Sequence, residues 1–407
     1  MKNNKTKQKK LMLLGGLRYL LPVIKAAHNH DYYVITVDYL PDNIAHKYSD
    51  EYHNVSIIDK DAVLQLAQSL EIDGIMSFAV DPGVVTAAYV AEKMGLPFQC
   101  SYETACILQD KSRFRQFLTD NDFNVPHAKG YSDKNAPMKD VDFFHWPVIV
   151  KPVDSAGSKG VSKVDNPENL SKAIDYALSE SHNGHFIIED FLEKVGCSSD
   201  TDCFSVDGHL TYCSFSDQMF DANADNPYTP SAYSWPSTIP QWAQDELLDE
   251  LQRLMTLLKM KTGIYNVETR LCTDGKPYIM EVSPRGGGNR LAEMLHYATR
   301  TDLIDLAVRA AVGDTLEALK NPTYYGHLAE IILHADTSGK FYSLDINENF
   351  KNDHVVETDL WVKKGDEVEG FSGANKAIGT LVLKFDSHKN LVENLGNYRE
   401  MIKLRIE

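Results

Sequence analysis

The apolar positions of the first hundred residues follow two periods. Short apolar runs predict buried strands at Leu11–Leu14, Tyr33–Val37 and Gly74–Phe78. Apolar residues at helical spacing lie between and after these runs, and they predict helices near 17–24, 61–70 and 83–94. Alternating strands and helices are typical of a parallel sheet with helices on both faces. We therefore expect a doubly wound parallel sheet at the N-terminal end.

The turn at Gly15-Gly16 joins the first strand to the first helix. A strand-to-helix turn of this kind could bind an anion, but the GxGxxG spacing of dinucleotide sites is absent. Tight packing of the turn is the favoured interpretation.

The pattern changes after residue 100. Helices are expected over 102–123, 242–259 and from 290 to about 319. Strands are expected at 147–152 and 186–189, with a hairpin over 203–215 and strand-rich sequence over 327–386. Residues 217–241 are rich in Asp, Asn, Pro and Ser, and they predict a long loop.

The segment 263–285 is predicted to be a hairpin that turns at Asp274-Gly275, a favoured two-residue turn. With those two residues as the loop, Glu268 lies directly opposite Glu281. Opposed like charges destabilise a sheet, and a cation between them removes that cost. Hard carboxylate ligands suit Mg²⁺. Two solvated glutamates on an exposed hairpin are the simpler alternative.

Composition narrows the functional classes. The chain has 407 residues, of which 43% are hydrophobic and 24% charged, as in ordinary globular proteins. Its net charge of −17 gives no general attraction to nucleic acid or to an anionic membrane. The six cysteines lack metal-ligand spacing and are expected to be reduced thiols of a cytoplasmic protein. Residues 1–10 are expected to be a disordered basic tail rather than a signal peptide, and no segment has the ~20 apolar residues that cross a membrane.

A basic strand end and a glycine-rich loop follow one another. Lys151 ends the apolar strand, and a lysine leaving a buried strand usually has a partner. The sequence Gly157-Ser-Lys-Gly160 follows, and the backbone N–H groups of such a loop can surround a phosphate. The GxxxxGK[ST] spacing of a Walker loop is absent, so a plain surface loop is an equal alternative.

Two further charged motifs are weak when each is taken alone. Glu189, Asp190 and Glu193 follow an apolar strand whose exposed backbone could bind an adenine edge. Asp110-Lys111 opens a helix with a charged turn. A solvated strand end and a solvated helix start are the simpler interpretations.

In their order along the chain, these motifs resemble the ATP-grasp superfamily, over nearly the whole chain. Within it, the chain is most similar to carbamoyl-phosphate-synthase-like and amino-acid-ligase-like members. The resemblance implies a mixed α/β and α+β fold in three domains. These are a doubly wound pre-ATP-grasp domain at 1–108, an ATP-grasp domain at 109–326 with a mobile lid at about 130–188, and a β-rich domain at 327–407. The matching motifs are Asp110-Lys111, Phe117-Leu118, Val125-Pro126, Pro147–Pro152, Ser155–Val161, Glu189–Glu193, Glu268, Glu281 and Arg285.

The resemblance also implies a role for each matching residue. The two lysines would hold the ATP phosphates, the glycine loop would close over them, and Glu189 and Leu192 would meet adenine, largely through their backbone. Arg285 would hold a substrate carboxylate or its acyl phosphate. The implied ATP-binding residues are Lys111, Lys151, Ser155, Gly157, Ser158, Gly160, Glu189, Asp190, Leu192 and Asp202. The implied ligands of Mg²⁺ (or Mn²⁺) are Glu268, Glu281 and Ser283, and the catalytic residues are Arg285 and Lys151.

Some of these assignments stay open. Asp202 is the first candidate for the ribose-binding acid, and Glu193 is the second. The family usually has Asn where this chain has Ser283, so the number of metal ions is open; Asn266, opposite Ser283, could compensate. Arg290 could bind substrate or simply begin a helix.

The implied activity is that of an ATP-dependent ligase that joins a carboxylate to an amine or a thiol through an acyl phosphate and releases ADP and phosphate. One alternative is a carboxylase-type enzyme that phosphorylates bicarbonate, and another is a non-catalytic ATP-binding regulatory protein. The expected partners are a small carboxylate and an amine, and a homodimer is possible. The loop over 217–235, with Tyr228, Tyr233 and Trp235, could line the acceptor pocket or simply pack on the surface.

Overall fold

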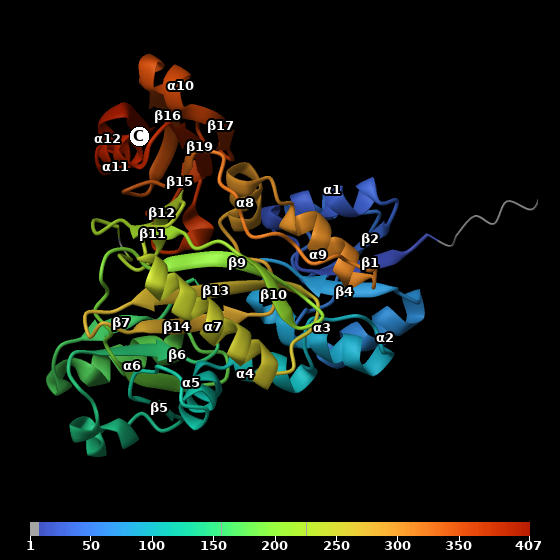
Figure 1. The fold of residues 1–407 in the computed structure, drawn as a ribbon, viewed down its shortest axis with the longest axis horizontal. Coiled ribbons are helices and arrows are strands. Elements are labelled where there is room, and N and C mark those ends of the chain that lie inside the picture. The colour runs from blue at the N-terminus through green and yellow to red at the C-terminus, as the bar shows by residue number, and fades with distance from the viewer. Residues whose placement is uncertain (1–7, 156, 225) are drawn as a thin grey trace, which may run out of the picture.

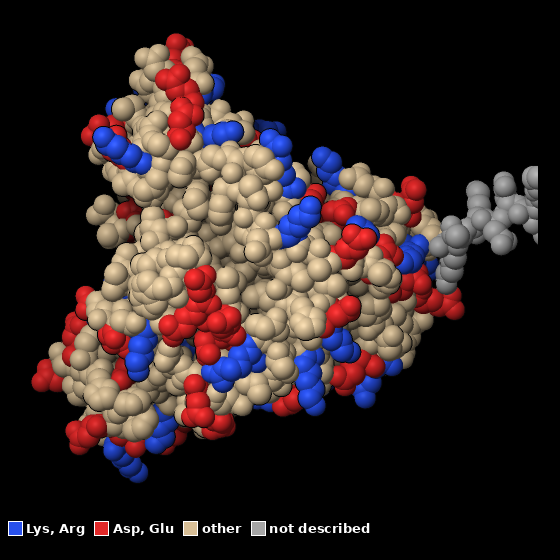
Figure 2. Space-filling view, in the orientation of Figure 1, with Lys and Arg blue, Asp and Glu red and all other residues tan. Residues whose placement is uncertain are grey.

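The computed structural model describes residues 8–155, 157–224 and 226–407. Residues 1–7, most of the predicted basic tail, lie outside this range. Figure 1 shows the N-terminal region at the right, the C-terminal region at the top and a further lobe at the lower left. The strands of the central part lie between the C-terminal region and this lower lobe. No helix among the described residues is long and apolar enough to cross a membrane. Figure 2 shows acidic and basic side chains interspersed on the face turned to the viewer.

The N-terminal sheet is parallel and doubly wound, as predicted. Its strands run in the order β3-β2-β1-β4. Leu11 and Leu13 face one apolar core, whereas Met12 and Leu14 face another, so the sheet is covered on both sides. The strands are β1 (Lys10–Leu14), β2 (Tyr33–Val37), β3 (Glu51–His53) and β4 (Gly74–Ser77); the helices are η1 (Arg18–Leu20), α1 (Leu21–Asn29), α2 (Lys60–Leu70) and α3 (Asp81–Met94), with η2 (Ile44–Lys47).

The lower lobe is an antiparallel sheet in the order β5-β8-β6-β7, with α6 packed on β6. Two helices, α4 and α5, lead into it from the N-terminal sheet. The strands are β5 (Ala128–Tyr131), β6 (Val148–Pro152), β7 (Ser162–Val164) and β8 (Phe186–Asp190); the helices are α4 (Tyr102–Gln109), α5 (Lys111–Asp120), α6 (Leu170–Ser179), η3 (Ala136–Lys139), η4 (Val141–Phe143) and η5 (Pro167–Asn169).

A second antiparallel sheet faces this lobe and has the order β10-β9-β13-β14. It contains both predicted hairpins, and the amphipathic helix α7 packs against it. The elements are β9 (Ser199–Val206), β10 (His209–Cys213), α7 (Gln241–Leu257), β13 (Gly263–Leu271) and β14 (Pro277–Ser283).

The prediction of a long loop over 217–241 is wrong. Two strands, β11 (Asp217–Phe220) and β12 (Pro230–Trp235), lie there and join the C-terminal sheet in the order β11-β12-β15-β19-β17. Some of the polar residues that suggested a loop lie between the two strands, but Asp217, Ser231 and Ser234 lie within them. β12 is stabilised by pairing with β15, almost a hundred residues later, and no local pattern reveals such a partner.

The C-terminal region completes this sheet and adds a small second one, ordered β18-β16-β20. The predicted helical segment after residue 290 contains two helices, and it ends at Ala311 rather than near 319. The elements are α8 (Leu291–Thr299), α9 (Leu303–Ala311), β15 (His327–Leu333), β16 (Gly339–Ile346), α10 (Glu348–His354), β17 (Val355–Leu360), β18 (Glu367–Val368), η6 (Ala374–Lys376), β19 (Gly379–Phe385), α11 (His388–Gly396), α12 (Tyr398–Met401) and β20 (Ile402–Ile406).

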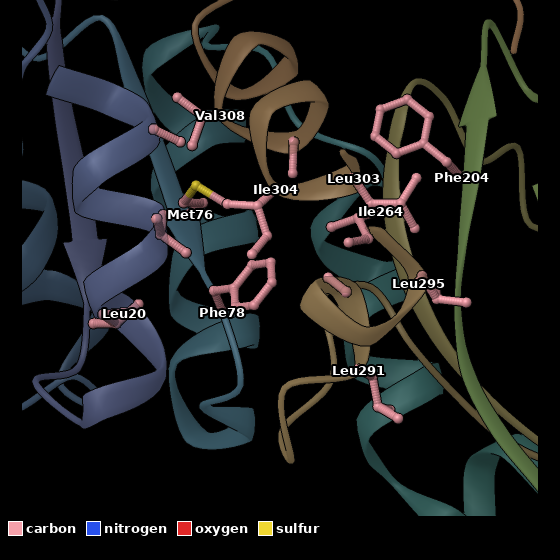
Figure 3. Packing of buried hydrophobic residues seen from close by; sticks show 14 of the residues in the cluster. Leu20, Met76, Phe78, Phe204, Ile264, Leu291, Leu295, Leu303, Ile304 and Val308 are labelled. Atoms are coloured by element: carbon pink, nitrogen blue, oxygen red, sulfur yellow. The ribbon is translucent and has the colours of Figure 1, made fainter. Parts of the chain in front are cut away.

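One apolar core is shared by all three regions. Figure 3 shows Met76 and Phe78 from the N-terminal sheet beside α8 and α9, with Phe204 of β9 on the far side of those helices. Leu328 of the C-terminal sheet belongs to the same cluster. The N-terminal sheet, the sheet that contains β9 and the C-terminal sheet are therefore packed together around α8 and α9.

Candidate functional site

Glu268 and Glu281 lie directly opposite each other on β13 and β14, as predicted. The turn differs from the prediction, because pairing near it is Leu271 with Pro277, which leaves five residues in the loop. A β-bulge between Glu268 and Thr269 restores the predicted register. Met280 is the extra residue of the bulge. Without the bulge, Glu268 would lie opposite Met280 instead of Glu281.

The pair belongs to a wider polar face that includes β9. In register, Asp200, Glu268 and Glu281 form one row across three strands. Asp202, Asn266 and Ser283 form the next row. Side chains two residues apart on a strand share a face, so both rows point to the same side of the sheet.

This face carries a surplus of negative charge. Burial, with Asp200 and Glu281 nearby, raises the pKa of Glu268 to about 8. Burial also raises the pKa of Asp200, although Asn266 and Tyr233 donate hydrogen bonds to its two oxygens at 2.8 and 2.9 Å. A cation placed between the glutamates would relieve the repulsion that these shifts express.

Lys111 reaches the same place from the first turn of α5. Asp110 caps that helix by accepting hydrogen bonds from the backbone N–H groups of Ser112 and Arg113. The Lys111 ammonium lies 3.5 Å from a Glu281 oxygen and donates to the carbonyl of Ser155 at 3.1 Å. Burial lowers the pKa of Lys111, but the carboxylates around it, above all Glu281, outweigh that effect and raise it.

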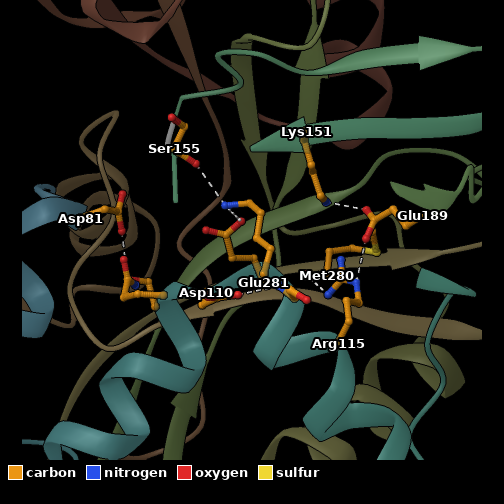
Figure 4. Close-up of polar contacts among 12 residues, drawn as sticks. Asp81, Asp110, Arg115, Lys151, Ser155, Glu189, Met280 and Glu281 are labelled. Atoms are coloured by element: carbon orange, nitrogen blue, oxygen red, sulfur yellow. Dashed lines mark hydrogen bonds and ion pairs between the residues drawn. The ribbon is translucent and has the colours of Figure 1, made fainter. Parts of the chain in front are cut away.

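Lys151 is held by Glu189, and Glu189 is held by Arg115. Lys151 donates to one carboxylate oxygen of Glu189 at 2.5 Å, and Arg115 Nε donates to the other at 2.9 Å (Figure 4). Despite its burial, the pKa of Glu189 is lowered to about 2 by these two cations. Burial, with Arg115 and Lys111 nearby, lowers the pKa of Lys151.

Arg115 also explains how the bulge is held. Its Nη1 donates to the carbonyl oxygen of Met280, the extra residue of the bulge, at 2.8 Å (Figure 4). One buried guanidinium thus fixes the Glu189 carboxylate and the backbone that brings Glu281 opposite Glu268. The sequence analysis missed Arg115. Its position one helical turn after Lys111, on the same face of α5, is the signal that could have revealed it.

Arg285 has a partner that the sequence analysis did not foresee. Two of its nitrogens donate to the two oxygens of Asp81, at 2.9 and 2.7 Å, and the third donates to the carbonyl of Gly286. Arg285 lowers the pKa of Asp81 in spite of burial. Asp81 begins α3, just beyond the carboxyl end of β4, where open parallel sheets usually bind ligands. That position is the signal that could have identified it.

The hydroxyl of Ser283 is already engaged. It donates to Asp81 at 3.1 Å and accepts from Gln109 at 2.8 Å. A hydroxyl bonded on both sides has at most one lone pair left for a cation. The metal site proposed below therefore rests on Glu268 and Glu281.

Residues 144–293, which contain most of these groups, match the family profile of the ATP-grasp domain. This segment is an ATP-grasp domain. The chain is 24% identical to a formate-dependent phosphoribosylglycinamide formyltransferase of Synechococcus sp. (strain WH7803), over 76% of this chain and 78% of that one. It is 23% identical to the carbamoyl phosphate synthase large chain of Pseudothermotoga lettingae, over 77% of this chain but only 29% of that longer protein.

Solved structures agree on the ATP-grasp fold. An L-amino acid ligase from Bacillus licheniformis superposes with a TM-score of 0.80 at 19% identity, over 98% of this chain and 99% of that one. A phosphoribosylglycinamide synthetase from Anaerococcus prevotii superposes with a TM-score of 0.76 at 20% identity, over 98% and 100%. The predicted fold class and superfamily are confirmed.

The glycine loop of the ATP-grasp domain lies above Lys111. Gly157 and Gly160 have φ of +69° and +71°, conformations that favour glycine. The Ser155 hydroxyl donates to the carbonyl of Glu180, and the Ser158 hydroxyl donates to that of Tyr228 at 3.0 Å. The loop is thus anchored to residues that precede β12, which brings it close to the C-terminal sheet.

The predicted adenine linker begins inside a sheet at Glu189. β8 is paired with β5 on one side and β6 on the other, so the Glu189 backbone lies within the sheet, and its side chain carries the contacts. Asp190 accepts hydrogen bonds from the backbone and ring of His145, both within 2.9 Å. The Leu192 carbonyl accepts from Arg270 at 3.2 Å.

The structure places Asp202 away from the adenine linker. The linker contacts the turn end of the β13–β14 hairpin, where Lys194 pairs with Cys272. The row that contains Asp202 is farther from that end than the row that contains Glu268. One Asp202 oxygen accepts from the Gly287 N–H at 2.7 Å, and burial raises the pKa of Asp202 to about 7. Asp202 thus supports the segment Gly286–Gly288 that follows Arg285, and the choice of Asp202 or Glu193 as the ribose-binding acid stays a prediction.

Proposed function

We propose that this ATP-grasp protein is an ATP-dependent ligase that joins a carboxylate to an amine through an acyl phosphate. The observation that supports the proposal most strongly is the half-buried, mutually repelling pair Glu268 and Glu281, with the ammonium of Lys111 beside it. Such an arrangement suits the charge of nucleotide phosphates and a divalent cation better than it suits an empty protein interior.

Each group of the site has a task in this proposal. Glu268 and Glu281 bind Mg²⁺ (or Mn²⁺), which, when bound, would neutralise charge on the ATP phosphates. Lys111 and Lys151 hold phosphate oxygens, and residues 155–160 exclude water above them. A biotin carboxylase domain from Hydrogenobacter thermophilus with the same fold was solved with MgADP and bicarbonate, which supports a nucleotide at this place.

The chemistry proceeds in two balanced steps. A carboxylate oxygen of the substrate attacks the γ-phosphorus, the bond to the bridging oxygen breaks, and ADP leaves. The amine nitrogen then attacks the acyl carbon, phosphate leaves, and the nitrogen loses a proton. Positioning and charge neutralisation provide most of the rate enhancement in such transfers. Arg285 orients the substrate carboxylate. Because its guanidinium already binds Asp81, Arg285 must either bind both carboxylates or release Asp81.

Two other activities remain candidates. A carboxylase-type enzyme would release ADP with bicarbonate and without an organic acid. A non-catalytic ATP-binding protein would bind ATP without turnover, and the engaged hydroxyl of Ser283 is the observation that favours it.

ADP release across a panel of small carboxylic acids and amines tests the proposal. We expect release that requires one acid, one amine and Mg²⁺, and that falls at least a hundredfold in Glu281→Gln, because the cation loses one of its two charged ligands. Glu393→Gln, an exposed glutamate on α11, is the matched control and should retain full activity. Normal turnover in Glu281→Gln would refute the metal assignment, and bicarbonate-dependent release alone would favour the carboxylase.

A further inference from the structure

Two imidazoles and one carboxylate converge at one edge of the lower-lobe sheet. The strands β5, β8 and β6 are antiparallel neighbours, so the end of β8 lies beside the start of both flanking strands. Asp190 is the last residue of β8, His127 directly precedes β5, and His145 lies three residues before β6. The sheet topology therefore brings these side chains together from three separate segments of the chain.

The three side chains face one another. Nδ1 of His145 lies 2.8 Å from one carboxylate oxygen of Asp190, and Nδ1 of His127 lies 3.4 Å from the same oxygen. The centres of the two imidazole rings are 4.7 Å apart, and one donor atom from each of the three residues lies within 4.8 Å of the other two. The histidine side chains are exposed, whereas that of Asp190 is 12% exposed. The cluster is therefore open to solvent on its histidine side.

Backbone hydrogen bonds hold this arrangement in place. The Asp190 N–H donates to the carbonyl of His127 at 2.9 Å, and the Phe191 N–H donates to the carbonyl of Pro147 at 2.9 Å. The second carboxylate oxygen of Asp190 accepts from the backbone N–H of His145 at 2.9 Å. An outer hydrogen bond of this kind orients a metal-binding carboxylate and leaves its other oxygen facing the two rings.

Hydrogen bonding alone leaves His127 unexplained. Among the described residues its Nδ1 has no hydrogen-bond partner, and the oxygen that it approaches already accepts from His145. Two protonated imidazoles at this separation would repel each other, whereas a metal ion binds both as neutral rings. In the part of the chain that the structure describes, Asp190 forms ion pairs with the two histidines and with no lysine or arginine. The place of a cation is therefore not taken by a basic side chain.

A second group of similar composition, formed by Asp221, His334 and Asp336, differs in this respect. The guanidinium of Arg399 pairs with both of its carboxylates. That group already has its positive charge, so the cluster around Asp190 is the better candidate for a metal ion.

We propose that His127, His145 and Asp190 bind a divalent transition metal ion, Zn²⁺ above all, with water completing the coordination. Two imidazoles and one carboxylate suit Zn²⁺, Co²⁺ or Ni²⁺, whereas Mg²⁺ prefers oxygen ligands alone. Bonds of about 2.0–2.1 Å place the ligand atoms of a tetrahedral zinc ion roughly 3.3 Å apart, a spacing that the exposed rings can reach by rotation.

The bound ion would join three segments of the lower lobe, which are β5, the residues before β6, and the start of the predicted adenine linker. Its ligands are distinct from Glu268 and Glu281, the proposed ligands of Mg²⁺. The inference therefore does not depend on the proposed ligase activity.

Calorimetric titration of the full chain with ZnCl₂, without an expression tag, tests the site. We expect saturable binding with a Kd in the micromolar range or below. The variants His127→Gln, His145→Gln and Asp190→Asn should each weaken it by at least about tenfold, because each removes one of three protein ligands. The matched control is His209→Gln, which changes an exposed histidine on β10 and should bind zinc like the wild type.

X-ray absorption of the protein with one equivalent of zinc identifies the ligands. We expect the signature of two imidazoles and no sulfur. A sulfur ligand would place the ion on one of the six cysteines, and a shell of oxygen atoms alone would place it at Glu268 and Glu281.

Thermal unfolding gives an independent readout. Zinc should raise the unfolding midpoint of the wild type and of His209→Gln by about 2 °C or more, and should raise that of the three site variants less. Without zinc, the histidine variants should unfold like the wild type, because both side chains are exposed. Binding no tighter than millimolar, a zinc shell without imidazole, or zinc affinity unchanged in both histidine variants would overturn the proposal. None of these measurements uses ADP release, so a failure of the ligase activity would leave this site standing.

Discussion

Replacing Arg115 by methionine is the sharpest test of how the site is built. Arg115 is 3% exposed and makes two contacts, with the Glu189 carboxylate and with the carbonyl of Met280. Methionine keeps most of the side-chain length and removes the charge. The substitution therefore leaves Glu189 with Lys151 as its one cation and leaves a carbonyl unpaired.

The magnitude follows from these contacts. The pKa of Glu189 is lowered from 4.5 to about 2, and at about 1.36 kcal/mol per pH unit this net shift corresponds to about 3 kcal/mol after the opposing effect of burial. The Coulombic attraction of Arg115 is the largest of the lowering causes, and the orphaned carbonyl adds about 1–2 kcal/mol. We expect Arg115→Met to lower the free energy of unfolding by about 3–4 kcal/mol, within the range for broken buried pairs.

Urea unfolding at pH 7 measures this loss, with Arg113→Met as control. Arg113 lies on the same helix and pairs with Glu103, but both side chains are exposed, so its removal should cost less than about 1 kcal/mol. Because the pKa of Glu189 is lowered in the folded state, its contribution is complete above its ordinary value and is lost as pH falls from 4.5 towards 2. The gap between the Arg115 variant and the wild type should therefore narrow in that window. Equal losses in the two arginine variants, or a gap that does not change with pH, would refute the reasoning.

Two further predictions concern the proposed metal site and the ion pair between Asp81 and Arg285. Since the pKa of Glu268 is raised to about 8, a bound cation must displace a proton below that pH, so Mn²⁺ affinity measured by electron paramagnetic resonance should rise about tenfold between pH 6 and 7 and level off above about 8. An Mn²⁺ affinity that is the same from pH 6 to 9 would contradict this prediction. Asp81→Asn should lower the free energy of unfolding by about 3 kcal/mol, because the buried guanidinium of Arg285 loses its carboxylate. A loss below 1 kcal/mol in urea unfolding would show that Arg285 finds another partner.

Features carried by local pattern could be predicted from the sequence. The parallel sheet follows from short apolar strands between helical stripes, and the opposed glutamates follow from a hairpin of known turn chemistry. Even there, the correct register depended on two compensating differences, a wider turn and a bulge at Met280. Neither difference has a local signal, because Arg115, from a distant helix, holds the bulge.

Features that depend on distant partners could not be predicted. β12 is a strand because β15 pairs with it, although the segment between β11 and β12 reads as a loop. Asp81 belongs to the site because α3 begins against Arg285, about two hundred residues later. The place of Asp202 could not be predicted for the same reason, since strand register decides on which side of Glu268 it lies.

The five-stranded sheet has a practical consequence for dissecting this protein. Two of its strands, β11 and β12, precede the predicted boundary at 326/327, and the other three follow it. A fragment cut there would leave each part with an unpaired strand edge, and such edges promote aggregation. Fragments of the chain are therefore poor reagents, and crystallisation, labelling and partner screens should use the intact polypeptide.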